Sequence, residues 1–122
     1  MTQERKVALV TGASRGIGAA IAQQLIQDGF FVVGTATSEA GAEKLSASFA
    51  ENGAGKVLDV RDGAAIDALV SDIEQSYGSV LVLVNNAGIT KDNLLLRMSE
   101  DDWDDILNIH LKAVYRLSKR VL

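Results

Sequence analysis

The sequence predicts an α/β fold in which helices cover both faces of a doubly wound parallel sheet. Four short apolar runs alternate with stretches whose apolar residues recur at helical spacing, which is typical of successive βα units. Each run is almost entirely apolar, as expected for parallel strands that are buried on both faces. The 122 residues form one predicted domain, long enough to bury about two thirds of the surface of the unfolded chain.

The apolar runs set the expected strands, and the patterns between them set the helices. We expect strands at Val7–Val10, Phe30–Gly34, Lys56–Val60 and Val80–Val84. The first expected helix, Gly16–Asp28, repeats apolar residues along one stripe. It is followed by Gly29, a residue type that commonly ends helices in the left-handed conformation. In the doubly wound arrangement the strands lie in the order 3-2-1-4 across the sheet.

Three further helices are expected along the chain. Ser38–Phe49 has the weaker pattern, whereas Asp62–Tyr77 repeats apolar residues regularly and ends before Gly78. The last and longest helix begins at Ser99, whose spacing from Asp102 resembles a capping box. Its first turns are acidic and its last turns basic, which suits the helix dipole: Glu100, Asp101, Asp104 and Asp105, then Lys112, Arg116, Lys119 and Arg120. We interpret both charge runs as solvated helix faces.

The composition excludes several classes of protein. The chain has no cysteine, which excludes disulfide frameworks, thiolate metal clusters and cysteine nucleophiles, and fits a reducing compartment. A net charge of −4 provides no basic surface for nucleic acid. No apolar run approaches the ~20 residues of a membrane helix, and the N-terminus does not resemble a signal peptide. We therefore expect a small cytoplasmic protein without a metal site and without nucleic-acid or membrane partners.

A glycine-rich segment joins the first expected strand to the first expected helix. It reads Thr11-Gly12-Ala13-Ser14-Arg15-Gly16-Ile17-Gly18. Glycines at such a turn tolerate positive φ, and they let backbone N–H groups and the helix N-terminus approach an anion. A second strand ends about 20 residues later, as in dinucleotide-binding folds. The segment therefore favours a nucleotide-phosphate site formed by Gly12, Ala13, Ser14, Arg15, Gly16, Ile17 and Gly18, rather than a plain structural turn.

Two motifs identify a family resemblance. The glycines of the first loop have the spacing Gly-x-x-x-Gly-x-Gly after Thr11, and Asn85-Asn86-Ala87-Gly88 follows the fourth expected strand. Both motifs, at these strand ends, resemble the short-chain dehydrogenase/reductase family. The resemblance implies a Rossmann-type sheet and a nicotinamide dinucleotide cofactor. It also implies that Asn86, Ala87, Gly88 and Ile89 run from the adenosine ribose towards the nicotinamide.

The end of the second expected strand bears on the choice of cofactor. NAD enzymes usually carry an acidic residue there that binds the ribose 2′-hydroxyl and would repel a 2′-phosphate. Here no acid occurs before Glu39, whereas Thr37 and Ser38 offer hydroxyl groups and Arg15 offers a positive charge. We therefore predict NADP(H). The alternative is that Ser38 only caps the following helix and that Arg15 is a surface cation.

The third expected strand contributes Asp59 and Val60. By the resemblance these residues line the adenine pocket, where the Asp59 carboxylate accepts a hydrogen bond from the adenine amino group. A turn or helix-capping role for Asp59 is equally compatible with the sequence.

Longer stretches are similar to one group within the family, the bacterial 3-oxoacyl-[acyl-carrier-protein] reductases. They are residues 6–18, 34–38, 85–94 and 115–119. The resemblance implies NADPH-dependent reduction of a carrier-protein-linked 3-oxoacyl thioester to the 3-hydroxyacyl form, by a homo-oligomer. It covers only the first half of such an enzyme, so residues 1–122 are expected to be an NADP-binding domain, incomplete at its C-terminus. The alternatives are another short-chain reductase, such as an acetoacetyl-CoA reductase, and a non-catalytic nucleotide-binding fragment.

No catalytic residue is predicted within the 122 residues. The family's chemistry uses a serine, a tyrosine that protonates the carbonyl oxygen, and a lysine four residues after that tyrosine, all beyond a fifth strand. Tyr115 and Lys119 have this spacing but follow the fourth strand, so we predict that they lie on a helix surface. His110 occupies the position of a further catalytic asparagine of the family, and Asn108 lies two residues away. A proton-relay role and a packing role for His110 both stay open.

The predicted strand order leaves Val80–Val84 at an edge of the sheet. This strand is all apolar and carries no lysine or proline that would discourage pairing with another chain. The final helix ends at Val121-Leu122 without a polar cap, and by the resemblance it packs in a subunit interface. We therefore expect the isolated chain to be marginally stable, self-associating or aggregation-prone rather than a stable monomer.

Overall fold

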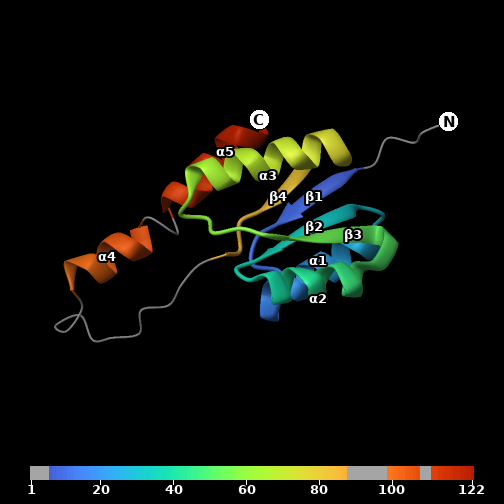
Figure 1. Cartoon of the computed structure of the whole chain (residues 1–122), viewed down its shortest axis with the longest axis horizontal. Helices are drawn as coiled ribbons and strands as arrows, with labels where there is room; N and C mark the ends of the chain where they lie inside the picture. Colours follow the sequence, from blue (N-terminus) through green and yellow to red (C-terminus); the bar gives the residue numbers. More distant parts are fainter. Residues whose placement is uncertain (1–5, 88–98, 108–110) are drawn as a thin grey trace.

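A computed structural model describes residues 6–87, 99–107 and 111–122 (Figure 1). In chain order its elements are β1 (Val7–Val10), α1 (Gly16–Gln27), β2 (Phe31–Ala36), α2 (Glu39–Phe49), the short 3-10 helix η1 (Ala50–Asn52), β3 (Gly53–Val57), α3 (Gly63–Ser76), β4 (Val80–Val84), α4 (Glu100–Leu107) and α5 (Ala113–Val121). The alternation of strands and helices expected from the apolar pattern is confirmed.

The strands form one sheet in the order β3-β2-β1-β4, and every neighbouring pair is parallel. This is the predicted order, and it confirms the Rossmann-like α/β fold. Val10, the last residue of β1, pairs with Gly34 of β2 and with Val84 of β4. The loops that follow these three strands therefore emerge at the same edge of the sheet, where ligands bind in doubly wound folds.

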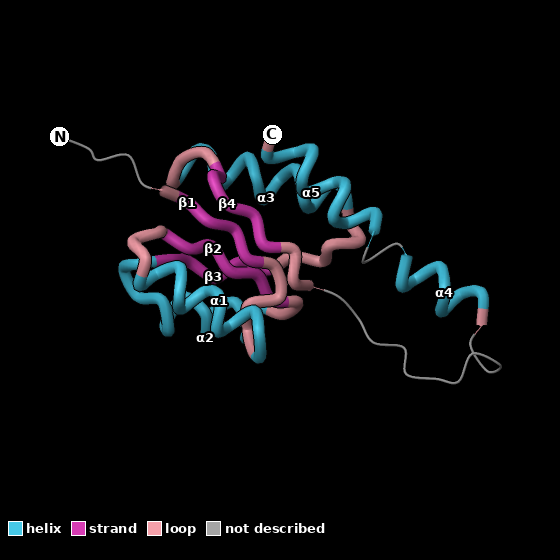
Figure 2. Tube along the Cα trace, turned by 180° about the vertical axis from the view of Figure 1, so that it is seen from behind, coloured by secondary structure: helices cyan, strands magenta, loops and turns pink. Residues whose placement is uncertain are grey.

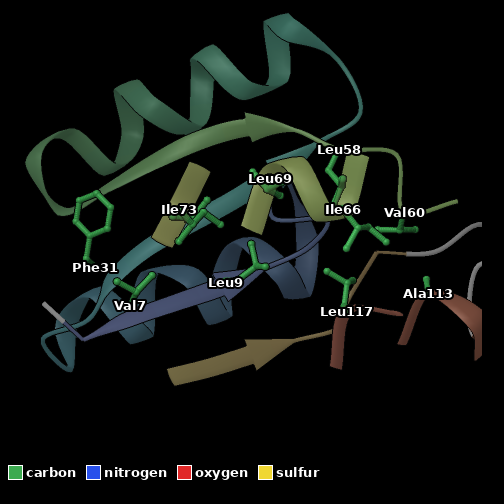
Figure 3. Packing of buried hydrophobic residues seen from close by; sticks show 11 residues of the cluster. Val7, Leu9, Phe31, Leu58, Val60, Ile66, Leu69, Ile73, Ala113 and Leu117 are labelled. Atoms are coloured by element: carbon green, nitrogen blue, oxygen red, sulfur yellow. The ribbon is translucent and has the colours of Figure 1, made fainter. Parts of the chain in front are cut away.

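Two helical layers cover the sheet (Figure 2). The layer of α3 and α5 encloses one apolar cluster (Figure 3), which includes Leu9, Phe31, Ile66, Ile73 and Leu117. The layer of α1 and α2 encloses the other, which includes Val10, Ala22, Val32, Leu45 and Phe49. Alternate residues of β1 enter opposite clusters because successive strand side chains point to opposite faces. Burial on both faces explains why this strand is wholly apolar.

β3 lies three residues earlier than the sequence suggested. The expected strand Lys56–Val60 is wrong, since the observed strand is Gly53–Val57 and starts in a run of small residues. A Cβ at Gly53 would collide with the Val32 carbonyl oxygen, and one at Gly55 with the Ala42 carbonyl oxygen. Close approach of β3 to β2 and α2 therefore requires glycine at these two positions. A search for runs of large apolar residues does not detect a strand that starts with glycine. β2 is likewise shifted, from the expected Phe30–Gly34 to Phe31–Ala36.

The C-terminal region has two helices where one was expected. The Ser99 hydroxyl accepts a hydrogen bond from the Asp102 backbone N–H at 3.0 Å, so the predicted helix start is confirmed. α4 ends at Leu107, α5 begins at Ala113, and residues 108–110 lie outside the described part of the chain. α5 packs on α3 through buried Ala113 and Leu117, whereas α4 lies apart from the sheet (Figure 1). The dipole-matched charge order therefore did not identify which part of the segment packs on the core.

β4 forms an edge of the sheet, as predicted, but it is not a regular strand. Val7 pairs with Val80 and Ala8 pairs with Val82, so Leu81 is an extra residue in the strand and is 64% exposed. Such a bulge interrupts the regular ladder at an edge. The edge strand therefore carries a local irregularity that its alternating Val-Leu sequence does not indicate.

Candidate functional site

A cavity of about 400 Å³ lies where β1, β2 and β4 end. Its walls come from the glycine loop, from the end of β2 and from the segment after β4: Gly12, Ser14, Arg15, Gly16, Ile17, Thr35, Ala36, Thr37, Leu58, Asn86 and Ala87. The structure therefore brings together most of the residues predicted from two motifs that are about 70 positions apart. Gly88 and Ile89, also predicted for this site, lie outside the described residues.

The glycines shape the first loop. Gly12 and Gly16 have φ values of +63° and +62°, which residues with a Cβ rarely adopt. Gly18 is buried in the first turn of α1, where a Cβ would collide with the Gly12 carbonyl oxygen and lie 2.5 Å from Asn86 Nδ2. The loop is thus folded closely over itself and against Asn86. This leaves the N-terminus of α1, which has no acidic residue in its first turn, facing the cavity as an anion site requires.

Thr11 connects the two motifs. Its hydroxyl accepts hydrogen bonds from the backbone N–H groups of Asn86 and Ala87, at 3.1 and 3.0 Å, and lies 3.4 Å from the Val84 carbonyl oxygen, to which it donates. The Asn86 side-chain amide donates in turn to the Gly12 carbonyl oxygen at 2.9 Å. Only 1% of Thr11 is exposed. We call these contacts the Thr11 clamp, because they fix the glycine loop and the segment after β4 as one wall.

Thr35 supports the same loop from β2. Its hydroxyl accepts from the Gly12 N–H at 3.2 Å, and its carbonyl oxygen accepts from the Ala13 N–H at 2.9 Å. Those two N–H groups therefore hold the loop in place, and Ala13 itself is buried in the core. Site prediction from the motifs omitted Thr11, Thr35 and Leu58 as functional positions. For Thr11 and Thr35 the available signal was a polar residue at the end of an apolar run, a signal that does not apply to Leu58.

The residues predicted to choose the cofactor are only partly brought together. Arg15 and Thr37 line the cavity and are exposed. Ser38 is not among its walls, and its hydroxyl accepts from the Gly41 N–H at 3.1 Å, which makes it the N-cap of α2. The capping role considered for Ser38 is therefore observed. Among the described residues that line the cavity, none carries a carboxylate.

Asp59 and Val60 lie beside the cavity rather than in its wall. Val60 is buried in the core under α3. The Asp59 carboxylate is held by Arg61, whose Nη2 lies 2.9 Å from Oδ2 and whose Nε lies 3.0 Å from Oδ1, and the Arg61 backbone N–H adds a bond of 2.9 Å. The side-chain hydrogen bonds from Arg61 are the main cause that lowers the pKa of the Asp59 carboxyl. Asp59 is thus an ionised turn residue, and its contact with adenine stays a prediction.

Tyr115 and Lys119 lie away from the glycine loop. They line a different cavity of about 420 Å³, between α3 and α5, together with Arg116 and Arg120. Tyr115 is 62% exposed, and Lys119 Nζ lies 3.5 Å from its hydroxyl. The structure thus supports the prediction that this pair is helix surface. His110 and Asn108 lie outside the described residues.

Among the described residues, no group of three or more histidine, aspartate or glutamate side chains is placed to hold a metal ion. Within the same residues, every helix is too short or too polar to cross a bilayer.

Comparisons with known proteins agree with this geometry. The family model described as short chain dehydrogenase matches residues 6–122. The 3-oxoacyl-[acyl-carrier-protein] reductases FabG of Vibrio harveyi and Escherichia coli are 54% and 52% identical to the chain over all 122 residues, which cover 50% of each relative. A crystal structure of a short-chain dehydrogenase from Streptomyces avermitilis superimposes with a TM-score of 0.88 at 37% identity, over 99% of this chain and 44% of that one.

The chain therefore spans about half the length of the curated relatives that it matches. The match nevertheless includes the whole glycine loop, the Thr11 clamp and all four strands. With a family match over residues 6–122 and relatives above 50% identity, the chain belongs to the short-chain dehydrogenase family.

Proposed function

We propose that this chain is the NADPH-binding part of a 3-oxoacyl-[acyl-carrier-protein] reductase. The observation that carries the proposal is the cavity at the ends of β1, β2 and β4, which has glycine-loop walls, a cationic Arg15 and no carboxylate among its described lining residues. A 2′-phosphate requires positive charge and hydroxyl donors and is repelled by the acidic residue usual in NAD sites. A carrier-protein-linked 3-oxoacyl substrate is proposed because the similar FabG proteins are 3-oxoacyl-[acyl-carrier-protein] reductases.

Different residues in and beside the cavity are assigned to different groups of NADPH. The N-terminus of α1, where Ser14, Gly16 and Ile17 line the cavity, would hold the pyrophosphate. Arg15 and Thr37 would hold the 2′-phosphate, with Ser38 directly after Thr37 in the segment that follows β2. Asp59 and Val60 would contact the adenine. Asn86 and Ala87, followed by Gly88 and Ile89, would lead towards the nicotinamide. When bound, NADPH supplies the hydride, and the described residues bind and orient it.

Arg15→Ala is expected to weaken NADPH binding about tenfold, since one charge-assisted contact to a phosphate contributes roughly 1.5 kcal/mol at a partly exposed site. NADH lacks the 2′-phosphate, so its affinity changes little. Isothermal titration calorimetry of both cofactors measures the difference. Lys112→Ala removes an exposed charge next to α5, outside the cavity, and serves as the control. Equal affinities of the unaltered chain for NADPH and NADH would contradict the proposed cofactor choice.

The 122-residue chain alone is expected not to reduce 3-oxoacyl thioesters. A bound cofactor still needs a positioned proton donor, and Tyr115 faces a different cavity from the glycine loop. Absorbance at 340 nm with NADPH and an acetoacetyl thioester measures turnover. A rate above background in mass-verified protein that Tyr115→Phe abolishes would overturn this expectation and assign catalysis to the α5 pair.

We also propose a cytoplasmic protein that associates with copies of itself. Leu81 of β4 is strongly exposed, and so are Leu111, Tyr115 and Leu122 in α5 and at its two ends. Apolar surface of this kind favours association. Static light scattering and thermal melts over a hundredfold range of protein concentration test the association. We expect a melting temperature that rises with concentration. A single monomeric species whose melting temperature is independent of concentration would contradict it.

A further inference from the structure

The turn after β3 brings a carboxylate close to the predicted 2′-phosphate site. Ala36 of β2 pairs with Val57 of β3, and the Leu58 N–H donates to the Ala36 carbonyl oxygen at 2.9 Å. Leu58, the residue before Asp59, lines the same cavity as Arg15 and Thr37. Asp59 is half-exposed and ionised. It is therefore an acidic group one strand away from the position where a carboxylate excludes NADPH.

Arg61 holds this carboxylate through both oxygens. Its guanidinium reaches Oδ1 through Nε at 3.0 Å and Oδ2 through Nη2 at 2.9 Å, and its backbone N–H also donates to Oδ1. A two-pronged contact of this kind fixes orientation as well as charge. The Asp62 N–H closes the turn on the Asp59 carbonyl oxygen at 3.0 Å. The pair is thus a local, preformed unit.

The same turn is anchored by α5. Arg116 of α5 donates through Nη1 to the Arg61 carbonyl oxygen at 2.9 Å. Asp105 of α4 also contributes, more weakly than Asp59, to raising the pKa of Arg61. Arg61 therefore stays charged and in place, because its backbone and its side chain each have their own partner.

We propose that Arg61 is a specificity-determining residue that lets an acidic adenine contact coexist with a 2′-phosphate. This inference rests on the proposed NADPH site. With Arg61 paired, the carboxylate keeps a free lone pair for the adenine amino group while its charge is cancelled. Without Arg61, the carboxylate stands unpaired near the cofactor's most negative group and repels it. NADH has no such group, so the repulsion discriminates against NADPH alone.

The test is a double-mutant cycle on Asp59 and Arg61. Its readout is the dissociation constant of NADH divided by that of NADPH, which is higher when NADPH is preferred. Arg61→Gln leaves Asp59 unpaired and is expected to lower the ratio about fivefold at low salt, with a smaller effect at high salt. Asp59→Asn leaves Arg61 unpaired and is expected to raise it. The double variant, Asp59→Asn with Arg61→Gln, returns the ratio to the unaltered value. Because the Asp59→Asn change alters the adenine contact of both cofactors alike, the ratio isolates the charge effect.

The contrary outcomes separate the inference from the proposed function. If Arg61→Gln weakens NADPH and NADH equally, or if the double variant fails to restore the ratio, Arg61 only stabilises the turn and the inference is overturned. Should Arg61→Gln fail to fold, an unchanged ratio in Asp59→Asn overturns it as well. If the unaltered chain binds neither cofactor, or does not prefer NADPH, the proposed function fails first, before any Arg61 variant is considered.

Discussion

Replacing Thr11 with valine is expected to destabilise the fold by about 2–3 kcal/mol, because a buried N–H group left without an acceptor costs roughly 1–3 kcal/mol. The Ala87 N–H loses the Thr11 hydroxyl, and the Asn86 N–H keeps only the Val84 carbonyl oxygen, at 3.2 Å. Valine keeps the branched shape of threonine, so the site gains no cavity, but a methyl group takes the place of the hydroxyl beside the two N–H groups. Urea denaturation followed by circular dichroism measures the loss, and NADPH affinity is expected to fall with it, since the clamp forms a wall of the cavity.

Thr11→Ser is the matched control. It retains the hydroxyl and removes one methyl group, so it is expected to cost only about 1 kcal/mol and to preserve NADPH binding. A valine variant as stable as the serine variant would show that water or another group satisfies Asn86 and Ala87. In that case the clamp would contribute nothing to stability.

Gly18→Ala is expected to abolish measurable NADPH binding, with at least roughly a hundredfold loss of affinity. Helix propensity alone predicts the opposite direction for stability, since alanine stabilises a helical position by about 1 kcal/mol relative to glycine. The added methyl group would collide with the Gly12 carbonyl oxygen and press on the Asn86 amide, so the loop must open. Backbone atoms cannot move aside as a flexible side chain can. Calorimetric titration with NADPH measures the loss of binding.

Gly29→Ala separates loop opening from general strain. Gly29 has a φ of +95°, a Cβ added there would meet no atom within 4 Å, and the residue follows α1 outside the cavity. Alanine at this position is expected to cost about 1–2 kcal/mol of stability and to leave NADPH affinity unchanged in the folded protein. If both alanine variants bind NADPH normally, the close packing at Gly18 does not shape the site.

Strand bounds, helix ends and strand order were predicted best where a single local pattern determined them. β1 and β4 are continuous apolar runs followed directly by polar or turn-forming residues, and their observed bounds agree with the expected ones. Gly29 follows α1 with the positive φ that its position indicated, whereas the positive φ of Gly78, which was expected only to follow a helix end, was not predicted. The strand order followed from the general arrangement of parallel sheets. These features depend on local pattern and on chain topology, both of which can be read before any contact is known.

Prediction was weaker for residues whose type fits two roles, or whose role depends on a contact with a distant part of the chain. β3 contains Gly53 and Gly55 because neighbouring backbones approach closely, and such contacts leave no periodic trace in the sequence. In the sequence, Asp59 could be either a turn residue or an adenine contact. Only the structure shows that its carboxylate accepts hydrogen bonds from Arg61 within the turn. Thr35 looks like one residue of a strand, yet its hydroxyl supports Gly12 from 23 positions away.

The Thr11 clamp also bears on the order in which the chain folds. Its bonds join residues 75 and 76 positions apart, whereas β1 pairs with β2 across an interval of only 24 residues, from Val7 to Phe31. Closing a longer loop costs more chain entropy, and contacts distant in sequence form later as a rule. During synthesis the first βαβ unit can assemble while the partners of Thr11 have not yet been added. The wall formed by the Thr11 clamp is therefore expected to form after the first βαβ unit, although the glycines of its loop are among the first residues made.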